Sequence, residues 1–275
     1  MRFFIFLLPL TFSNGFAPND VIHQLSQDIS LPFEFKYRKS IIRIKHLEKE
    51  KVTKAVSLCL QEYGSYTFQN NMTPLDKKIQ AKINDVTNFI LSFVILLGLG
   101  QRVERLEKVM SDPNEIQDHN VICIYKVDQN QKEHMMGLAE VSLQPPDPAH
   151  TAPPFVLPSH IKNAFSKIGI WKTVQPYISN VLITNEYRGK GYSKLLMTAC
   201  EGICRKWGYD NVYLHVSAEA GSSKAAQNLY KTLGYMPVVD KTYNKHFGWM
   251  GVDVVNWGLY VVDGAALLFL KKELK

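Results

Sequence analysis

The chain has 275 residues, of which 46% are apolar and 21% are charged, so it can bury a full hydrophobic core. These proportions exclude a disordered or fibrous protein. The 32 basic and 25 acidic residues leave a net charge of +7, and basic residues are dense between positions 36 and 54. Acidic residues interleave with them and no nucleic-acid motif accompanies them, so we expect a solvated face and no nucleic-acid partner.

The four cysteines are too few and too scattered for a disulfide framework. Cys200 and Cys204 are four residues apart in a helical pattern, but the further Cys or His ligands that a zinc site requires do not accompany them. We therefore expect core thiols and no metal site.

The N-terminus has the outline of a removable leader. A short apolar stretch that ends near Gly15 is typical of a signal peptide over residues 1–15 and is too short to span a bilayer. The junction Gly15-Phe16-Ala17-Pro18 resembles the Phe-Ala-Pro cleavage motif of bipartite leaders, which carry proteins into the complex plastids of diatom-like algae. We therefore expect a plastid transit segment over residues 16–37 and plastid localisation. Secretion is the alternative, and Asn71 offers a glycosylation sequon for it.

The first elements of the domain follow from periodicity. Alternating isoleucine and basic residues predict a strand over 37–45, and apolar residues at helical spacing predict a helix over 48–63. A second helix begins at Pro74, a residue type that favours the first helical position. Its apolar run from Phe89 to Leu99 is too short to cross a bilayer, so we expect a buried core helix. A membrane-surface or partner-binding helix is the alternative.

The remaining elements predict a sheet with helices packed on it. Apolar strands over 121–127 and 136–143 flank a polar stretch and indicate a hairpin. Prolines then mark an irregular excursion, which returns through a short helix over 159–168. The rest of the chain alternates between strands, over 177–183, 212–217, 236–239 and 267–270, and helices, over 192–207 and 223–233.

A basic turn with two glycines joins the strand over 177–183 directly to the helix that begins at Tyr192. The unpaired amides and the positive dipole end of a helix N-terminus attract an anion, and a pyrophosphate fits there. Gly189 and Gly191 let the backbone approach such a ligand closely. Three side chains add positive charge: Arg188, Lys190 and Lys194.

A second motif follows in Ala226-x-x-Leu229-Tyr230-x-x-x-Gly234-Tyr235, where a glycine ends a helix and Tyr230 lies on a different face from the leucines. Together with Arg188-Gly189-Lys190-Gly191-Tyr192-Ser193, it resembles the GNAT family of N-acetyltransferases. The resemblance implies an α+β protein over residues 38–275, with a three-layer α/β/α fold around a mixed, mostly antiparallel central sheet. It also implies acetyl-CoA as co-substrate.

The resemblance assigns roles to individual residues. The strand backbone of Val181, Leu182 and Ile183 would pair with the pantetheine arm, and the phosphates would be held by Arg188, Gly189, Lys190, Gly191, Tyr192, Ser193 and Lys194. Tyr230 would protonate the departing thiolate; the alternative is a buried tyrosine that satisfies a backbone carbonyl. His215 would be the general base that deprotonates the amine. The alternative is that His215 is a packed strand histidine, in which case Glu219 or a water chain would be the base. Ser223 stands where the family commonly has an asparagine that contacts CoA.

The implied activity is acyl transfer to a primary amine, most readily to protein N-terminal α-amines or lysine side chains, as in plastid members of the family. A small-molecule amine is one alternative acceptor. The other alternative is a non-catalytic acyl-CoA-binding or membrane-associated adaptor, although membrane association is not favoured. Aromatic residues between positions 241 and 264 either line the acceptor site or form a small hydrophobic core under a long loop.

Overall fold

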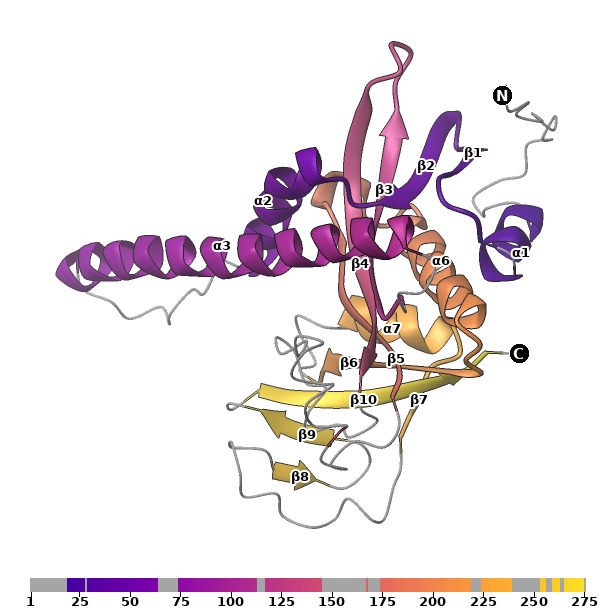
Figure 1. Ribbon diagram of the computed structural model, residues 1–275. Helices are drawn as coiled ribbons and strands as arrows, with labels where there is room; N and C mark the ends of the chain where they lie inside the picture. Colours follow the sequence, from indigo (N-terminus) through magenta and orange to yellow (C-terminus); the bar gives the residue numbers. More distant parts are fainter. Residues whose placement is uncertain are drawn as a thin grey trace.

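The computed structural model describes residues 19–27, 29–63, 74–112, 117–144, 167, 174–218, 224–238, 253–255, 259–262 and 265–274 (Figure 1). The expected signal peptide, Glu219 and Ser223 lie outside these residues, as does most of the short helix predicted over 159–168.

The described strands form one sheet in the order β1-β2-β3-β4-β5-β6-β10-β9-β8, with β7 paired to β10. They are β1 (Phe33–Tyr37), β2 (Ser40–His46), β3 (His119–Val127), β4 (Glu133–Gln144), β5 (Gln175–Ile183), β6 (Asn211–Ser217), β7 (Met236–Pro237), β8 (Asp253–Val255), β9 (Leu259–Val262) and β10 (Ala265–Glu273). Every pair is antiparallel except β5 with β6. This confirms the expected mixed, mostly antiparallel sheet.

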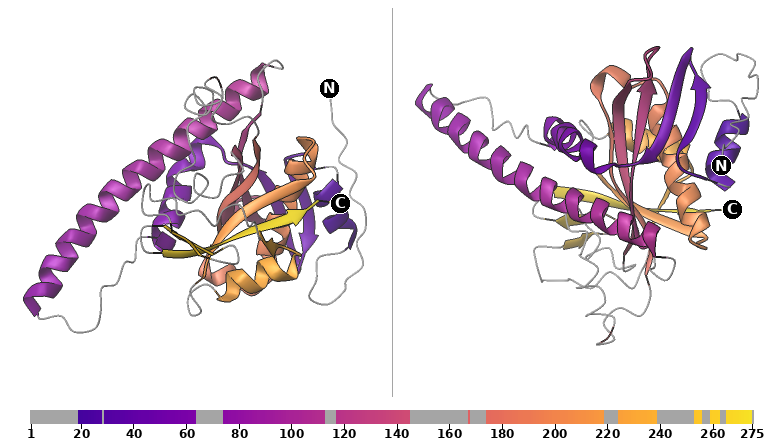
Figure 2. Two further views of the ribbon diagram at one scale, coloured as in Figure 1. Left: turned by 90° about the horizontal axis from the view of Figure 1, so that it is seen from below. Right: turned by 45° about the horizontal axis from the view of Figure 1, so that its top comes forward.

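Helices cover both faces of the sheet (Figures 1 and 2). The α-helices are α1 (Asn19–Gln27), α2 (Val52–Tyr63), α3 (Pro74–Ser111), α6 (Tyr192–Lys206) and α7 (Lys224–Thr232), and the short 3-10 helices are η1 (Lys49–Lys51) and η2 (Asn185–Tyr187). The helices over 48–63, 192–207 and 223–233 and most of the predicted strands are therefore confirmed to within a few residues. The predictions did not include α1, β1, β8 or β9.

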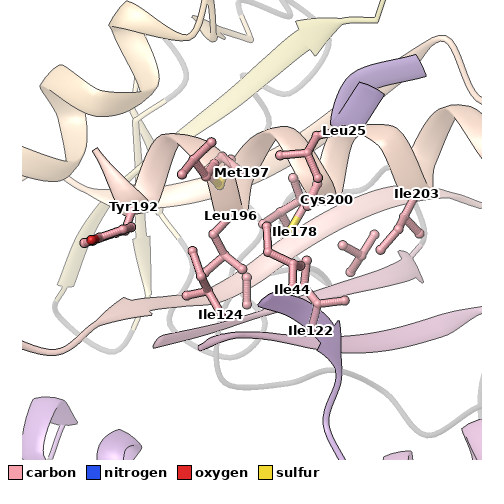
Figure 3. Packing of buried hydrophobic residues seen from close by; sticks show 14 of the residues in the cluster. Leu25, Ile44, Ile122, Ile124, Ile178, Tyr192, Leu196, Met197, Cys200 and Ile203 are labelled. Carbon is pink, nitrogen blue, oxygen red and sulfur yellow. The ribbon is translucent and has the colours of Figure 1, made fainter. Parts of the chain in front are cut away.

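Strand β3 shows how one sheet supports two cores, because successive side chains of a strand point to opposite faces. Ile122 and Ile124 belong to the cluster that α1 and α6 cover, together with Leu196 of α6 (Figure 3). Val121 and Cys123 belong to the cluster that α2 and α3 cover. The result is the three-layer α/β/α fold, of class α+β, that the resemblance implied.

Helix α3 is only partly buried, so the prediction of a core helix over the whole run from Phe89 to Leu99 is wrong. Leu99 and Val103 are buried against the sheet, whereas Phe89 is 72% exposed. The other large apolar residues exposed on this helix are Val86, Ile90, Phe93, Val94, Leu96, Leu97 and Met110. The N-terminal half of α3 extends past the sheet (Figures 1 and 2), and no neighbouring element in the described structure covers it. Across the described helices, none combines the length and the apolarity needed to cross a membrane.

The segment 19–37 belongs to the folded domain, although the sequence placed it in a transit segment. Val21 and Leu25 of α1 are 3% and 0% exposed and lie in the same cluster as α6, and β1 pairs along its length with β2. Removal of this segment would expose apolar side chains of the core. The packed elements of the described structure therefore begin at Asn19, before the expected start of the domain at residue 38.

Candidate active site

The site is built where β5 and β6 diverge. These parallel strands pair at a single position in the described structure, Tyr177 with Tyr213. Beyond Tyr177, the edge of β5 that carries Val181, Leu182 and Ile183 therefore makes no ladder with β6. An extended ligand that carries amide groups can hydrogen-bond to such a strand edge.

A bulge accounts for the direction of β5. The register with β4 shifts between Leu138 and Glu140, and Asn180 opposite this shift has a φ of +50°. Asparagine tolerates this left-handed conformation better than most residues do. An extra residue in one strand bends it and increases its twist, so the bulge turns the end of β5 away from β6.

The turn after β5 presents backbone amides. Gly191 is the N-cap of α6 with a φ of +86°, and Gly189 has a φ of +70°, a region that favours glycine. No side chain caps the start of α6, so the helix begins with amides that a ligand can use. A helix N-terminus with close backbone access fits a pyrophosphate, and Ser193 and Lys194 lie in the first turn of this helix.

The basic side chains of the turn are engaged within it. Arg188 donates from Nε to the carbonyl oxygen of Ile183 at 2.8 Å, and Lys190 donates from Nζ to the carbonyl oxygen of Glu186 at 2.6 Å. The Lys190 ammonium also lies 5.6 Å from the centroid of the Tyr187 ring. Both positive charges therefore stay at the turn, and the bond from Arg188 holds the turn against the end of β5.

A tyrosine from the N-terminal segment completes the turn, and the sequence analysis did not identify it. Tyr37, at the end of β1, donates from its hydroxyl to the carbonyl oxygen of Lys190 at 2.9 Å. Its ring packs edge-on against Tyr192, with 5.4 Å between the ring centroids. The two partners are 153 positions apart, and no local pattern at Tyr37 indicates a role in a turn that lies so far along the chain.

Tyr230, the expected acid, is a buried residue of α7 whose ring packs edge-on against Tyr235 at 5.8 Å. Burial raises the pKa of Tyr230, and the nearby Cys200 thiol raises it further. The phenol therefore keeps its proton throughout the neutral range. A protonated phenol can donate a hydrogen bond, as the expected role requires.

His215, the expected base, has the surroundings of a packed strand histidine. Its Nδ1 lies 2.8 Å from the hydroxyl of Tyr177, and its ring stacks on Phe269 with 4.7 Å between centroids. Burial lowers the pKa of His215 to about 3. A base must hold the proton that it removes, and a group with so low a pKa holds one weakly, so the structure favours the alternative that the sequence left open.

The structure brings the other chemistry-bearing groups into packing roles. All four cysteines are buried thiols, and burial raises the pKa of Cys59 and of Cys123 to about 12. In the part of the chain that the structure describes, no group of three or more His, Cys, Asp or Glu side chains is arranged to hold a metal ion.

Comparison with known proteins places these elements in a family. Residues 101–235, which contain β3 to α7, match the model of the Acetyltransferase (GNAT) family. No curated protein matches the chain.

Solved structures with similarity to the chain include acetyltransferases from several organisms. An N-acetyltransferase from Staphylococcus aureus Mu50 is 12% identical, with 85% of this chain and 99% of that chain covered and a TM-score of 0.42. The ribosomal-protein-S5-alanine acetyltransferase from Vibrio fischeri is 10% identical, with 88% and 97% covered and a TM-score of 0.45. PaiA N-acetyltransferase from Thermoplasma acidophilum, in complex with coenzyme A, is 13% identical, with 84% and 98% covered and a TM-score of 0.43.

Proposed function

The chain belongs to the acetyltransferase (GNAT) family and is an acyltransferase, and we propose that it transfers the acetyl group of acetyl-CoA to primary amines of proteins, either N-terminal α-amines or lysine side chains. The observation that carries this proposal is the position of the uncapped N-terminus of α6 directly after the diverging end of β5. At this place the first backbone amides of α6 can bind a pyrophosphate. The adjacent edge of β5 can hydrogen-bond to the amide groups of the pantetheine arm.

The residues of the turn fit acetyl-CoA. Gly189 and Gly191 have no Cβ, so phosphate oxygens can reach the first amides of α6. Arg188 and Lys190 keep two positive charges at the turn through their hydrogen bonds to Ile183 and Glu186. When bound, acetyl-CoA supplies the thioester carbonyl that an amine attacks.

Tyr230 acts on the leaving sulfur in this proposal. A free thiol has a pKa of about 8.5 and a free phenol one of about 10, and burial raises the pKa of Tyr230 further. The phenol is therefore always available as a hydrogen-bond donor to the sulfur as negative charge develops there. It gives its proton to the departing thiolate when the carbon–sulfur bond breaks, and the strongly basic phenolate then takes a proton back from water.

The acceptor amine must lose a proton before it attacks, since a lysine ammonium titrates near 10.4. Because burial lowers the pKa of His215 to about 3, we assign this proton to water or to Glu219 rather than to the imidazole. His215 then orients the Tyr177 hydroxyl at the point where β5 and β6 meet.

The exposed face of α3 supports a protein acceptor over a small amine. Phe89, Phe93 and Leu97 are 72%, 54% and 47% exposed, and apolar surface of this extent commonly marks contact with another macromolecule or a membrane. A small amine has no use for such a surface.

Acetyl-group mass spectrometry of a bacterial proteome tests the proposal. We would express residues 16–275, which retain α1 and β1, and the same chain with Tyr230→Phe as the matched control. We expect new acetylation of N-termini or lysines in the culture that expresses residues 16–275. The culture that expresses the Tyr230→Phe chain should lack this acetylation.

Equal acetylation in the two cultures would contradict a protein acceptor. Purified chain would then be assayed with acetyl-CoA and a panel of small amines. Turnover with an amine would identify a small-molecule enzyme, and an absence of turnover would overturn the catalytic assignment of this site.

We also propose that residues 1–15 direct the chain into the secretory route and that a plastid is its destination. The packing of Val21 and Leu25 against α6 supports a mature chain that retains Asn19–Tyr37. Fusion of residues 1–37 to a fluorescent protein in a diatom-like alga tests the destination, and plastid fluorescence is expected. Fluorescence outside the cell would support plain secretion instead.

A further inference from the structure

The N-terminal segment contacts both ends of the helix that forms the turn. At the C-terminal end of α6, Arg205 donates from Nη1 to the carbonyl oxygen of Ser26 at 2.8 Å. A Cβ at Gly202 would lie 2.0 Å from the carbonyl oxygen of Leu25, so glycine is needed for α1 to approach this closely. At the N-terminal end, Tyr37 bonds to Lys190.

The hydroxyl of Tyr37 determines the direction of one amide at the turn. The carbonyl of Lys190 and the N–H of Gly191 belong to the same peptide unit, and in a trans peptide these two groups point in opposite directions. Because the carbonyl points toward Tyr37, the Gly191 N–H points away from it. A Cβ at Gly191 would lie 2.8 Å from the Tyr37 hydroxyl, so the contact leaves no space for a side chain.

A strained hairpin holds Tyr37 in place. Tyr37 pairs with Ser40 across a two-residue turn, and both turn residues, Arg38 and Lys39, have positive φ values of 47° and 60°. Positive φ at both positions is typical of a type I′ turn, and this left-handed conformation is unfavourable for residues other than glycine. The Arg38 guanidinium lies 5.5 Å from the centroid of the Tyr37 ring. Strain of this kind is most often retained where it serves function.

We propose that Tyr37 is a positioning residue for acetyl-CoA: its hydroxyl orients the Lys190–Gly191 peptide so that the Gly191 amide faces the pyrophosphate. This inference rests on the proposed acetyl-CoA site. It makes the segment Asn19–Tyr37 part of the acetyl-CoA-binding site rather than a removable leader. It also means that Tyr37 affects binding of the phosphate-bearing end of acetyl-CoA alone.

The test compares full-length protein with Tyr37→Phe, which keeps the ring against Tyr192 and removes the hydroxyl. A hydrogen bond contributes about 1 kcal/mol, which corresponds to roughly fivefold in a dissociation constant. We expect the acetyl-CoA Kd in calorimetry to rise about fivefold, while kcat at saturating acetyl-CoA changes less than twofold. Tyr209→Phe removes a phenol hydroxyl beyond the far end of α6 and serves as the matched control.

S-acetylpantetheine, which carries the thioester and the pantetheine arm but no pyrophosphate, separates positioning from a general structural effect. With S-acetylpantetheine, Tyr37→Phe and the parent protein should have nearly the same kcat/KM. With acetyl-CoA, the kcat/KM of Tyr37→Phe should be about fivefold lower than that of the parent protein. Equal losses with both substrates, or no loss with acetyl-CoA, would overturn the assignment. Failure of the parent protein to bind acetyl-CoA would instead overturn the proposed function.

Discussion

The side-chain amide of Asn180 donates to the carboxylate of Glu140 at 2.8 Å, and the other oxygen of that carboxylate accepts from Arg102 of α3 at 2.5 Å. Glu140 is 1% exposed. A buried carboxylate is stable only when it is paired and hydrogen-bonded. This pair of contacts therefore ties the bulge of β5, which separates β5 from β6, to a helix on the opposite face of the sheet from α6.

Substitution of Glu140 should be strongly destabilising. Glu140→Ala leaves the Arg102 guanidinium without this partner and Asn180 without its acceptor, so we expect the free energy of unfolding to fall by about 3 kcal/mol or more. Glu104→Ala is the matched control, because the pair of Glu104 with Lys108 is exposed and 3.7 Å long and such pairs contribute at most about 1 kcal/mol. Urea unfolding measures both values, and similar losses would refute a structural role for the Glu140 contacts.

Substitution by alanine should change the free energy of unfolding in opposite directions at the two helical glycines Gly202 and Gly98. A Cβ at Gly202 would collide with the backbone of α1, whereas a Cβ at Gly98 meets no atom within 4 Å. We expect Gly98→Ala to raise the free energy of unfolding by up to about 1 kcal/mol through helix propensity and Gly202→Ala to lower it by about 1–3 kcal/mol through overpacking.

Limited proteolysis adds a local readout to this comparison. Detachment of α1 in Gly202→Ala should speed cleavage within residues 19–37, while Gly98→Ala is cleaved like the parent chain. A Gly202→Ala protein with normal stability and normal protection would show that the segment does not pack on α6 in solution.

Tyr230→Phe should separate catalysis from binding. The variant keeps the buried ring and removes the only ionisable proton of the side chain, so we expect kcat to fall about a hundredfold or more while the acetyl-CoA Kd stays within twofold. Steady-state kinetics and calorimetry measure these quantities. A kcat close to that of the parent chain would leave Tyr230 as a core residue only.

The buried His215 should make the fold sensitive to acid. Its folded pKa of about 3 lies below the unfolded value of about 6.5, so between these values the unfolded chain binds the additional proton. The free energy of unfolding should therefore decrease as the pH falls from 6.5 toward 3, by up to about 1.4 kcal/mol per pH unit from this residue.

The variant His215→Gln isolates this contribution, since it retains a polar group opposite Tyr177. Urea unfolding between pH 4.5 and 6.5 should show a shallower slope for the variant than for the parent chain. The acidic limb of the kcat/KM profile should be the same in both proteins, and its loss in the variant would restore His215 as the base.

Local features of the sequence determined the central part of the fold. The alternation of residues in β3 and β4, the helical spacing in α6 and the glycines at 189 and 191 act over a few positions, and their period and conformational preferences can be read without knowledge of the partners. The turn before α6 and the motif around Tyr230 were sufficient to indicate the GNAT family, whose model matches residues 101–235.

The tertiary structure decided what depends on partners far apart in the chain. The apolar run of α3 was predicted to be buried, but burial depends on which element covers a helix, and Phe89 is 72% exposed. His215 has the residue type of a base, yet it is packed against Tyr177 and Phe269, and burial lowers its pKa to about 3. Tyr37 carries no local motif, and its place at the turn arises because the sheet and α6 bring its hydroxyl to the Lys190 carbonyl.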